Sequence, residues 1–243
     1  MTKKRDLIYS KPKDKVADFI FDEKVAGVFD DMIQRSVPGY ADIEKMVGVL
    51  AEKYAQPNSN CYDLGCSLGA ASLSMQKSIN QPNCKIIAVD NSEAMVSHCR
   101  QNLKDSVSDT PVDVICSDVC NVEIKRASIV VINFTLQFIA KEKRLDLLKR
   151  IHQGLLPSGA LILSEKIAFK DSEEGKTQND LHDTFKKLND YSDLEISQKR
   201  TALENVLIPE ALTEHEKRLK TAGFNKVYVW FRCFNFASII AFK

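Results

Sequence analysis

The chain is 243 residues long, which is enough for one domain with a sizeable core. Charged residues make up 28% of it, yet the formal net charge is only +1, so no overall positive field attracts nucleic acid. No apolar run approaches the ~18 residues of a membrane span, and the first residues, Met-Thr-Lys-Lys-Arg-Asp, lack the apolar core of a signal peptide. We therefore expect a cytoplasmic protein that binds neither membranes nor, directly, nucleic acid.

The seven cysteines form no Cys-x-x-Cys pair, and no set of Cys and His residues has the spacing of zinc ligands. Their odd number, and their positions mostly within strand-like and helical patterns, indicate reduced thiols in a cytosolic protein. We expect no metal site.

The N-terminal segment contains an amphipathic helical pattern. Val25, Val28 and Met32 recur at helical spacing, and Val37-Pro38-Gly39 ends the pattern at a turn directly before Tyr40. Two interpretations stay open from the residues alone. The helix either packs on the body of the protein or forms a lid whose Tyr40 faces a ligand.

From residue 43 onward, short apolar runs alternate with helical patterns. This alternation predicts βαβ units, and therefore a parallel sheet covered by helices on both faces. Ser92 is expected to cap the helix after the second strand, and Pro157-Ser158-Gly159 to turn the chain into the fifth strand. The expected helices are 43–54, 68–79, the one capped by Ser92, and 141–155; the expected strands are the one ending at Leu64, then 85–90, 112–115, 127–132 and 160–163.

The pattern changes between residues 166 and about 208, where charge is high and the helical signals are interrupted. We interpret this segment as a helical insertion over the carboxyl ends of the strands. The elements expected within and beyond it are helices 181–188, 194–203 and 210–222, the last ending at Gly223, and an antiparallel pair of strands, 227–231 and 234–242. The chain is thus predicted to be an α/β protein with a Rossmann-like, seven-stranded, mostly parallel sheet and an antiparallel final strand.

Residues 61–69, Cys-Tyr-Asp-Leu-Gly-Cys-Ser-Leu-Gly, join the first strand to a helix through a turn bracketed by glycines. A P-loop is excluded because Gly69 is followed by alanines and not by Lys-Ser/Thr. A dinucleotide is disfavoured because Ser67 stands where the pyrophosphate needs a second glycine, and Ala70 where the third would fall. A nucleoside without phosphates needs less room, so the turn predicts S-adenosylmethionine.

Polar residues end the strands that follow this turn. Asp90 lies 25 residues after Gly65, close to the ~20 expected for a carboxylate that accepts hydrogen bonds from ribose hydroxyls. Asp118 ends the third strand, where it or a neighbouring amide would meet the adenine, and Asn133 ends the fourth. Open α/β sheets bind ligands at these carboxyl ends. Each residue alone has a simpler interpretation as a loop cap, but together they indicate a ligand site.

The Asp-x-Gly-x-x-x-Gly turn, the acids at 90 and 118 and the final antiparallel pair resemble the class I S-adenosylmethionine-dependent methyltransferase fold over residues 43–243. On this resemblance, residues 1–243 form a single domain, with 1–42 as an N-terminal lid and 166–208 as the insertion over the active site. Longer blocks are similar to the carboxy-S-adenosylmethionine synthase family: 21–23, 31–40, 62–71, 133–138, 163–166, 195–200 and 233–236.

This resemblance implies a reaction other than methyl transfer. The family converts S-adenosylmethionine and prephenate to carboxy-S-adenosylmethionine and phenylpyruvate, with the sulfonium ylide capturing the carbon dioxide that prephenate releases. The implied functional partner is a tRNA carboxymethyltransferase, which uses the product to build the 5-oxyacetyl group of wobble uridine. A homodimer is also implied, and the apolar N-terminal helix is our candidate for its contact.

The family's functional residues are carried over position by position. The resemblance places Arg200 where the transferred carboxylate is held, a role that suits the planar fork of arginine. Arg35 or Lys199 is expected to add positive charge for prephenate, and His182 is not expected to be catalytic. The implied contacts to S-adenosylmethionine are Tyr40, Gly65, Cys66, Ser67, Asp90, Asn91, Asp118, Val119, Asn133 and Arg200.

Two other functions stay open. The chain is alternatively a methyltransferase acting on a small metabolite, or a non-catalytic protein that binds S-adenosylmethionine. Methylation of an exocyclic base amine is disfavoured, because Asn133 is followed by Phe-Thr-Leu and not by the Pro-Pro-aromatic sequence usual for that activity.

Overall fold

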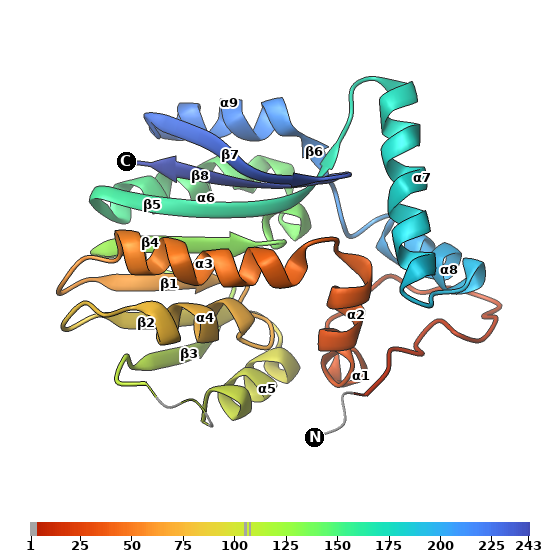
Figure 1. The fold of residues 1–243 in the computed structure, drawn as a ribbon, viewed down its shortest axis with the longest axis horizontal. Helices are drawn as coiled ribbons and strands as arrows, with labels where there is room; N and C mark the ends of the chain where they lie inside the picture. The colour runs from red at the N-terminus through yellow and green to blue at the C-terminus, as the bar shows by residue number, and fades with distance from the viewer. Residues whose placement is uncertain (1–3, 105, 107) are drawn as a thin grey trace.

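The computed structural model describes residues 4–104, 106 and 108–243. Its centre is a sheet in which seven strands follow the order β3-β2-β1-β4-β5-β8-β7 (Figure 1). Strands β1 to β5 are parallel, whereas β8 runs antiparallel to both of its neighbours, β5 and β7. The strands are β1 Asn60–Leu64, β2 Lys85–Asp90, β3 Val112–Cys116, β4 Ala127–Asn133, β5 Leu155–Ala168, β7 Lys226–Cys233 and β8 Phe236–Phe242.

The predicted mostly parallel sheet with an antiparallel final strand is confirmed, with one addition. A further strand, β6 (Glu210–Ala211), pairs in parallel with the end of β5 at Ile167 and Ala168, so the sheet has eight strands and not seven. Two residues are too few to leave a periodic pattern, which is why β6 was not predicted. Its residues were expected to be the start of the following helix.

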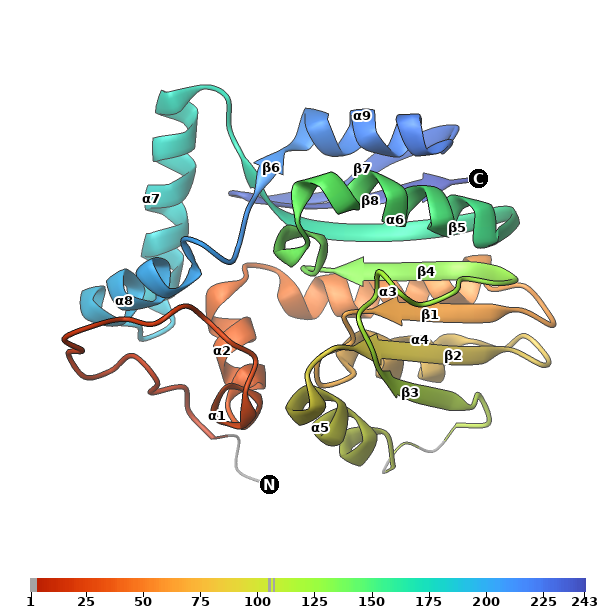
Figure 2. The ribbon, with the colours of Figure 1, turned by 180° about the vertical axis from the view of Figure 1, so that it is seen from behind.

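Helices cover both faces of the sheet (Figures 1 and 2). Along β4, Ile129 belongs to the core beneath α3 and α4, whereas Val130 belongs to the core beneath α6 and α9. This alternation follows from the two-residue period of a strand that is buried on both sides. The covering helices are α3 Tyr40–Tyr54, α4 Ala70–Ser78, α5 Glu93–Lys104, α6 Lys141–Gly154 and α9 Leu212–Ala222.

One end of each of two helices was predicted correctly. Ser92 accepts a hydrogen bond from the amide of Met95 at 3.2 Å and so caps α5. Gly223 ends α9 in the left-handed conformation, with a φ of 113°. The predicted turn at 157–159 was wrong, because these residues lie within β5. There the pairing with β4 shifts register between Ala127 and Ile129, and Ser158 adopts a φ of 62°, so the strand absorbs the irregularity without ending.

The carboxyl ends of the parallel strands are covered by a separate layer of helices (Figures 1 and 2). It consists of α1 Glu23–Ala26, α2 Phe29–Ser36, α7 Ser172–Leu188 and α8 Asp193–Leu203. The predicted N-terminal helix is thus two helices, which are separated at Gly27 and Val28. Residues 1–3 of the predicted lid lie outside the described part of the chain.

The N-terminal segment and the insertion are bonded to each other across this layer. Gln198 of α8 donates hydrogen bonds to the carbonyls of Tyr9 and Lys11, both at 2.9 Å. The apolar residues of α1 and α2, including Val25 and Met32, are buried in a cluster that also contains Ala202 of α8. The apolar face that we expected to contact a second subunit is therefore already covered within this chain.

Candidate functional site

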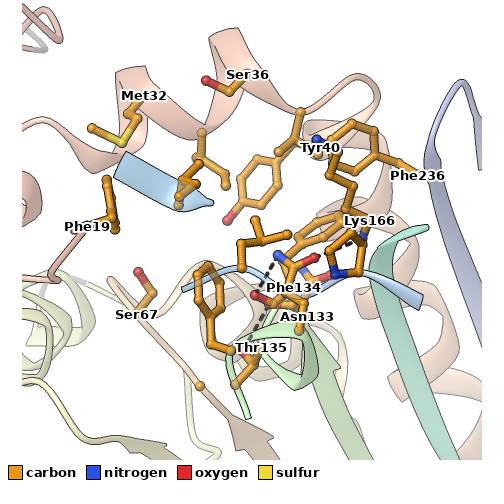
Figure 3. A pocket seen from close by; sticks show the side chains of 18 of the residues that line it. Phe19, Met32, Ser36, Tyr40, Ser67, Asn133, Phe134, Thr135, Lys166 and Phe236 are labelled. Carbon is orange, nitrogen blue, oxygen red and sulfur yellow. Dashed lines mark hydrogen bonds between the residues drawn. The ribbon is translucent and has the colours of Figure 1, made fainter. Parts of the chain in front are cut away.

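A cavity of about 990 Å³ lies between the carboxyl ends of the strands and the covering layer of helices (Figure 3). Ligand sites for single small molecules range up to about 1,000 Å³, so the cavity has room for a nucleoside and a second small molecule. All ten residues that the resemblance assigned line it: Tyr40, Gly65, Cys66, Ser67, Asp90, Asn91, Asp118, Val119, Asn133 and Arg200.

The turn after β1 leaves its backbone close to the cavity wall. Gly65 has a φ of 87°, and a Cβ atom placed on it would lie 2.0 Å from Oγ1 of Thr135, so no other residue fits there without movement. Ser67 also has a positive φ, of 49°, and its amide donates to Oδ2 of Asp90 at 2.9 Å. The turn and the end of β2 are thereby fixed against each other.

The acids at the ends of β2 and β3 are held by backbone amides. Oδ1 of Asp90 accepts from the amide of Ser92 at 2.9 Å, and Oδ1 of Asp118 accepts from the amide of Cys120 at 2.8 Å. Burial raises the pKa of Asp90, while its amide contacts act in the opposite direction. Both carboxylates are oriented by their own strand-end loops and keep acceptor positions for a ligand in the cavity.

Two further acids, Glu44 and Asp63, line the cavity; the sequence analysis noted Asp63 only as part of the turn motif and did not identify Glu44. We call them the acid pair. Oε1 of Glu44 accepts from Nδ2 of Asn133 at 2.6 Å. Oε2 of Glu44 and Oδ1 of Asn133 are buried without a hydrogen-bond partner of good geometry among the described residues, although the Tyr40 hydroxyl lies close enough to Glu44 to lower the pKa of its carboxyl group. Burial, and then the nearby Asp63, raise the pKa of Glu44 to about 8.

Asp63 is the buried, last-but-one residue of strand β1, and it accepts a hydrogen bond from Oγ of Ser72 at 2.6 Å. Burial raises its pKa to about 6. Two carboxyl groups that are close together and removed from water are costly to ionise unless a cation joins them. The acid pair is therefore suited to a ligand that brings positive charge, as S-adenosylmethionine does at its sulfonium and its ammonium group.

Tyr40 is the first residue of α3 and faces the cavity. The chain enters the helix through Gly39, whose φ is 75°. A Cβ atom placed on Gly39 would lie 2.3 Å from the ring of Phe231, so the glycine leaves room for that ring. Burial, and then the Glu44 carboxylate, raise the pKa of the Tyr40 hydroxyl well above its usual range. Tyr40 thus lies where the N-terminal segment joins a helix that covers the sheet.

Arg200 lies on α8, where its guanidinium forms an ion pair with Asp183 through Nη2. Its side chain is 64% exposed, so its other donors are free to meet a ligand at the cavity mouth. Lys199 points inward instead, and its Nζ donates to Oγ of Ser36 at 2.9 Å.

Of the two cations expected to add positive charge, Lys199 lines the cavity and Arg35 does not. The Nε of Arg35 donates to the carbonyl of Asn189 at 2.6 Å, its Nη1 contacts Asp31 at 3.0 Å, and its guanidinium stacks on the ring of Tyr191 at 3.9 Å. These contacts bind α2 to the loop between α7 and α8. Three further cations line the cavity and were given no role by the sequence analysis: Lys166 at the end of β5, Lys143 and Lys186.

His182 is buried in α7, and its Nε2 donates to the carbonyl of Ser36 at 2.8 Å. Burial, and then the nearby Lys186 and Lys166, lower its pKa to about 3, so the ring is neutral at physiological pH. Its contact joins α7 to the end of α2. Within the described residues, no three His, Cys, Asp or Glu side chains are arranged to hold a metal ion.

The strand order, the glycine turn and the acids at the strand ends together define a class I S-adenosylmethionine-dependent methyltransferase fold. Residues 62–159 match a family model described as a methyltransferase domain. Human N-acetylserotonin methyltransferase in complex with S-adenosylmethionine has a similar fold, with a TM-score of 0.62 at 18% identity over 91% of this chain and 55% of that one. A methyltransferase from Leishmania major gives a TM-score of 0.58 at 15% identity over 91% and 78%.

Much closer likeness is found among carboxy-S-adenosyl-L-methionine synthases. The synthase of Shewanella pealeana is 55% identical over 243 residues, and that of a Geobacter species is 58% identical over 244 residues, each over 100% of both chains. The chain belongs to the carboxy-S-adenosyl-L-methionine synthase family.

Proposed function

We propose that the protein is an enzyme that converts S-adenosyl-L-methionine and prephenate to carboxy-S-adenosyl-L-methionine and phenylpyruvate. The observation that carries this proposal is the distribution of charge in one cavity. The acid pair, Glu44 and Asp63, lies at the end of the cavity near the glycine turn, while Lys166 and Arg200 line the side formed by β5 and the insertion. S-adenosylmethionine is cationic and prephenate is a dianion, so the two regions match the two substrates of the family's reaction.

The reaction balances without an oxidant or a metal ion. Prephenate loses its ring carboxyl group as carbon dioxide and its ring hydroxyl group as hydroxide, and the ring becomes aromatic. The sulfonium methyl group loses a proton, and the resulting carbanion forms a carbon–carbon bond with the carbon dioxide. The proton and the hydroxide give water.

The intermediate carbanion requires a site from which bulk water is excluded. Support for such a site comes from the layer formed by α1, α2, α7 and α8, whose segments are bonded to one another over the strand ends. We propose that residues 1–42 and the insertion 166–208 act in this way as the lid of a single domain.

Within this cavity we assign roles to the residues that line it. Asp90 accepts hydrogen bonds from the ribose, and Asp118 with Val119 lies against the adenine. Asn133 and Glu44 meet the charged methionine part through the acceptors that lack a partner of good geometry among the described residues. Tyr40, Gly65, Cys66, Ser67 and Asn91 complete the S-adenosylmethionine site, and Arg200 holds the carboxyl group that is transferred.

Incubation of the purified protein with S-adenosylmethionine and prephenate tests the proposal. Mass spectrometry is expected to detect a product heavier than S-adenosylmethionine by one carboxyl group, together with an equal amount of phenylpyruvate. Formation of S-adenosylhomocysteine without phenylpyruvate would overturn the proposal and favour a methyltransferase. Retention of S-adenosylmethionine with no product from any substrate would favour a binding protein.

Arg200→Ala is expected to weaken the binding of carboxy-S-adenosylmethionine by about tenfold or more, because a charge-assisted contact to the new carboxylate is lost. Its affinity for S-adenosylmethionine, which lacks that carboxylate, is expected to change less than twofold. Isothermal titration of each ligand measures both values. Equal losses for the two ligands would contradict the role assigned to Arg200.

The setting of the reaction is a further part of the proposal. We place the enzyme in the cytoplasm as a homodimer that supplies a tRNA carboxymethyltransferase, without itself binding tRNA. In the described part of the chain, no helix is long and apolar enough to cross a membrane. Exposed leucines on α7 and α8, namely Leu181, Leu188 and Leu194, support a contact between subunits.

A further inference from the structure

Lys166 follows the buried Glu165 near the end of β5, and the two side chains point to opposite faces of the strand. The amides of Leu136 and Gln137 donate to the Glu165 carboxylate at 2.9 and 2.8 Å, whereas Lys166 lines the cavity. Figure 3 shows Lys166 near Asn133 and Phe236, across the cavity from Ser67. Its charged end is therefore directed at the second half of the cavity, away from the glycine turn.

The ammonium group of Lys166 has no hydrogen bond or ion pair with any described residue. Burial, and then repulsion from Lys186, lower its pKa to about 8, so it is mostly protonated at pH 7. Lys166 is half-buried, and a cation held partly out of water without a partner is unfavourable, so such groups are retained where a ligand completes them. The structure thus contains a cationic site that lacks its counter-ion.

The insertion adds two more cations beside Lys166. Lys186 of α7 and Arg200 of α8 both repel the charge of Lys166 and lower its pKa. Both also form ion pairs with the same carboxylate, Asp183. We call Lys166, Lys186 and Arg200 the cation cluster. With Asp183 these groups carry a net charge of +2, which matches a dianion and exceeds what a monoanion would neutralise.

Two other cations of the region, Arg35 and Lys199, are already engaged. Arg35 is bonded to Asn189 and Asp31, and Lys199 is bonded to Ser36 with the carboxylates of Asp6 and Asp31 nearby. Neither needs a ligand to complete its contacts. Lys166 differs from both because its ammonium group makes no hydrogen bond or ion pair with a described residue.

We propose that Lys166 binds the carboxylate of the second substrate that remains on the 2-keto acid, while Arg200 binds the carboxylate that is transferred. The inference rests on the proposed function and extends it, since it assigns the two carboxylates of a dianionic substrate to two separate cations. Lys186 adds charge but stays paired with Asp183. Phenylpyruvate keeps only the carboxylate assigned to Lys166, and carboxy-S-adenosylmethionine gains only the one assigned to Arg200.

Three variants test this assignment. Lys166→Met keeps the length of the side chain and removes its charge, and Lys166→Arg keeps the charge. Lys176→Met makes the same change at an exposed position of α7 that does not line the cavity. Kinetics with each substrate varied, and inhibition by phenylpyruvate, are measured for all three and for the unchanged protein.

Lys166→Met is expected to raise the KM for prephenate and the inhibition constant of phenylpyruvate by about tenfold to a hundredfold, the usual loss for a charge-assisted hydrogen bond. The KM for S-adenosylmethionine is expected to stay within twofold. Lys166→Arg is expected to restore most of the affinity, and Lys176→Met to behave like the unchanged protein. The ligand-free Lys166→Met protein is expected to melt at the same temperature or higher, because a half-buried unpaired charge is gone.

A KM for prephenate within twofold of normal in Lys166→Met, or an equal loss for both substrates, would overturn the inference while leaving the proposed function intact. If the unchanged protein forms no carboxylated product, the proposed function fails, and calorimetric binding of prephenate then decides the inference separately. Should Lys166→Met not fold, Lys166→Gln provides the same comparison with a polar side chain.

Discussion

At the scale of single residues, the cavity departs from the rule that buried charges are paired within the protein. Glu44 and Lys166 both line the cavity, and neither forms an ion pair with any described residue. Each is unfavourable for the empty protein and favourable once a ligand of opposite charge binds. Part of the binding free energy of each substrate therefore comes from a side chain that has no ion-pair partner in the empty protein.

The raised pKa of Glu44 predicts a pH-dependent affinity for S-adenosylmethionine. Below about pH 8 the empty protein holds a proton on Glu44, and a bound cation favours its release. Affinity is therefore expected to rise between pH 6 and 8, by up to about tenfold per pH unit, with protons released on binding at pH 7. Calorimetry in buffers of different ionisation enthalpy measures this release.

Glu44→Gln is the matched variant for this measurement. It keeps the shape of the side chain and an acceptor for Asn133 but has no proton to release. We expect weaker binding of S-adenosylmethionine with a flatter dependence on pH. A pH dependence as steep as that of the unchanged protein would show that Asp63, whose pKa lies at about 6, and not Glu44, is the group that titrates.

Glu44 and Lys166 also mark the limit of what the sequence reveals about single residues. Asp90, Asp118 and Asn133 were found because they end predicted strands, and the carboxyl ends of parallel strands meet at one edge. Glu44 lies within a helix, where a lone acid normally faces solvent, and Lys166 follows a strand end in a charged segment. Only the three-dimensional arrangement shows that both face the cavity.

At the scale of elements, the position of Arg200 depends on how α8 begins. Ser192 and Glu195 form a capping box, with the Glu195 amide donating to Ser192 Oγ at 3.3 Å and the Ser192 amide donating to the Glu195 carboxylate at 2.8 Å. Glu195 is also buried, which fixes the first turn of the helix. Arg200 lies in the last turn of α8. Because the cap fixes the start of the helix, it also fixes the side of the cavity from which the guanidinium projects.

Ser192→Ala is expected to lower the free energy of unfolding by about 1 kcal/mol, the usual effect of losing a helix cap. Because α8 carries Arg200, the KM for prephenate is expected to rise severalfold while the affinity for S-adenosylmethionine stays unchanged. Denaturant unfolding and steady-state kinetics measure these effects. Thr184→Ala, at an exposed position of α7, is the control, and an identical rise in KM there would refute the specific role of the cap.

The elements themselves were mostly evident from periodicity, and the exceptions have local causes. The β2 strand was placed at its observed ends because Lys85 to Val89 is an apolar run that ends on an acid. Strand β5 proved much longer than predicted, since Pro157 to Gly159 form an irregularity within it. Helix α3 starts earlier than its apolar pattern because Gly39, not an apolar residue, determines where it begins.

At the scale of the whole molecule, the insertion carries the most exposed large apolar side chain among the described residues, that of Leu188, together with two further exposed leucines. Leu188 is 80% exposed and Leu181 lies two turns earlier on α7, with Leu194 nearby on α8. Apolar groups that remain in water are stabilised by burial against a partner. Since α1 and α2 are already packed within the chain, we place the contact of the proposed homodimer on the insertion.

Light scattering is expected to give a mass near twice the 27.4 kDa of one chain. Leu188→Glu is expected to shift the protein toward the monomer, because a charge would enter an apolar contact. Val49→Glu changes another exposed apolar residue, on α3 far from the insertion, and is expected to leave the mass unchanged. A monomeric unchanged protein, or dissociation by Val49→Glu alone, would contradict this placement.

The short β6 strand has a consequence for how the insertion is attached to the sheet. Because Ile167 and Ala168 pair with Glu210 and Ala211, the insertion leaves and rejoins the sheet at a single point. Arg144 and Arg218 both form ion pairs with Glu210 and secure that junction from α6 and α9. The intervening segment therefore carries α7 and α8 over the cavity without interrupting the order of the strands. Lys166 at the end of β5 and Arg200 on α8 thereby reach the same cavity from the two sides of this junction.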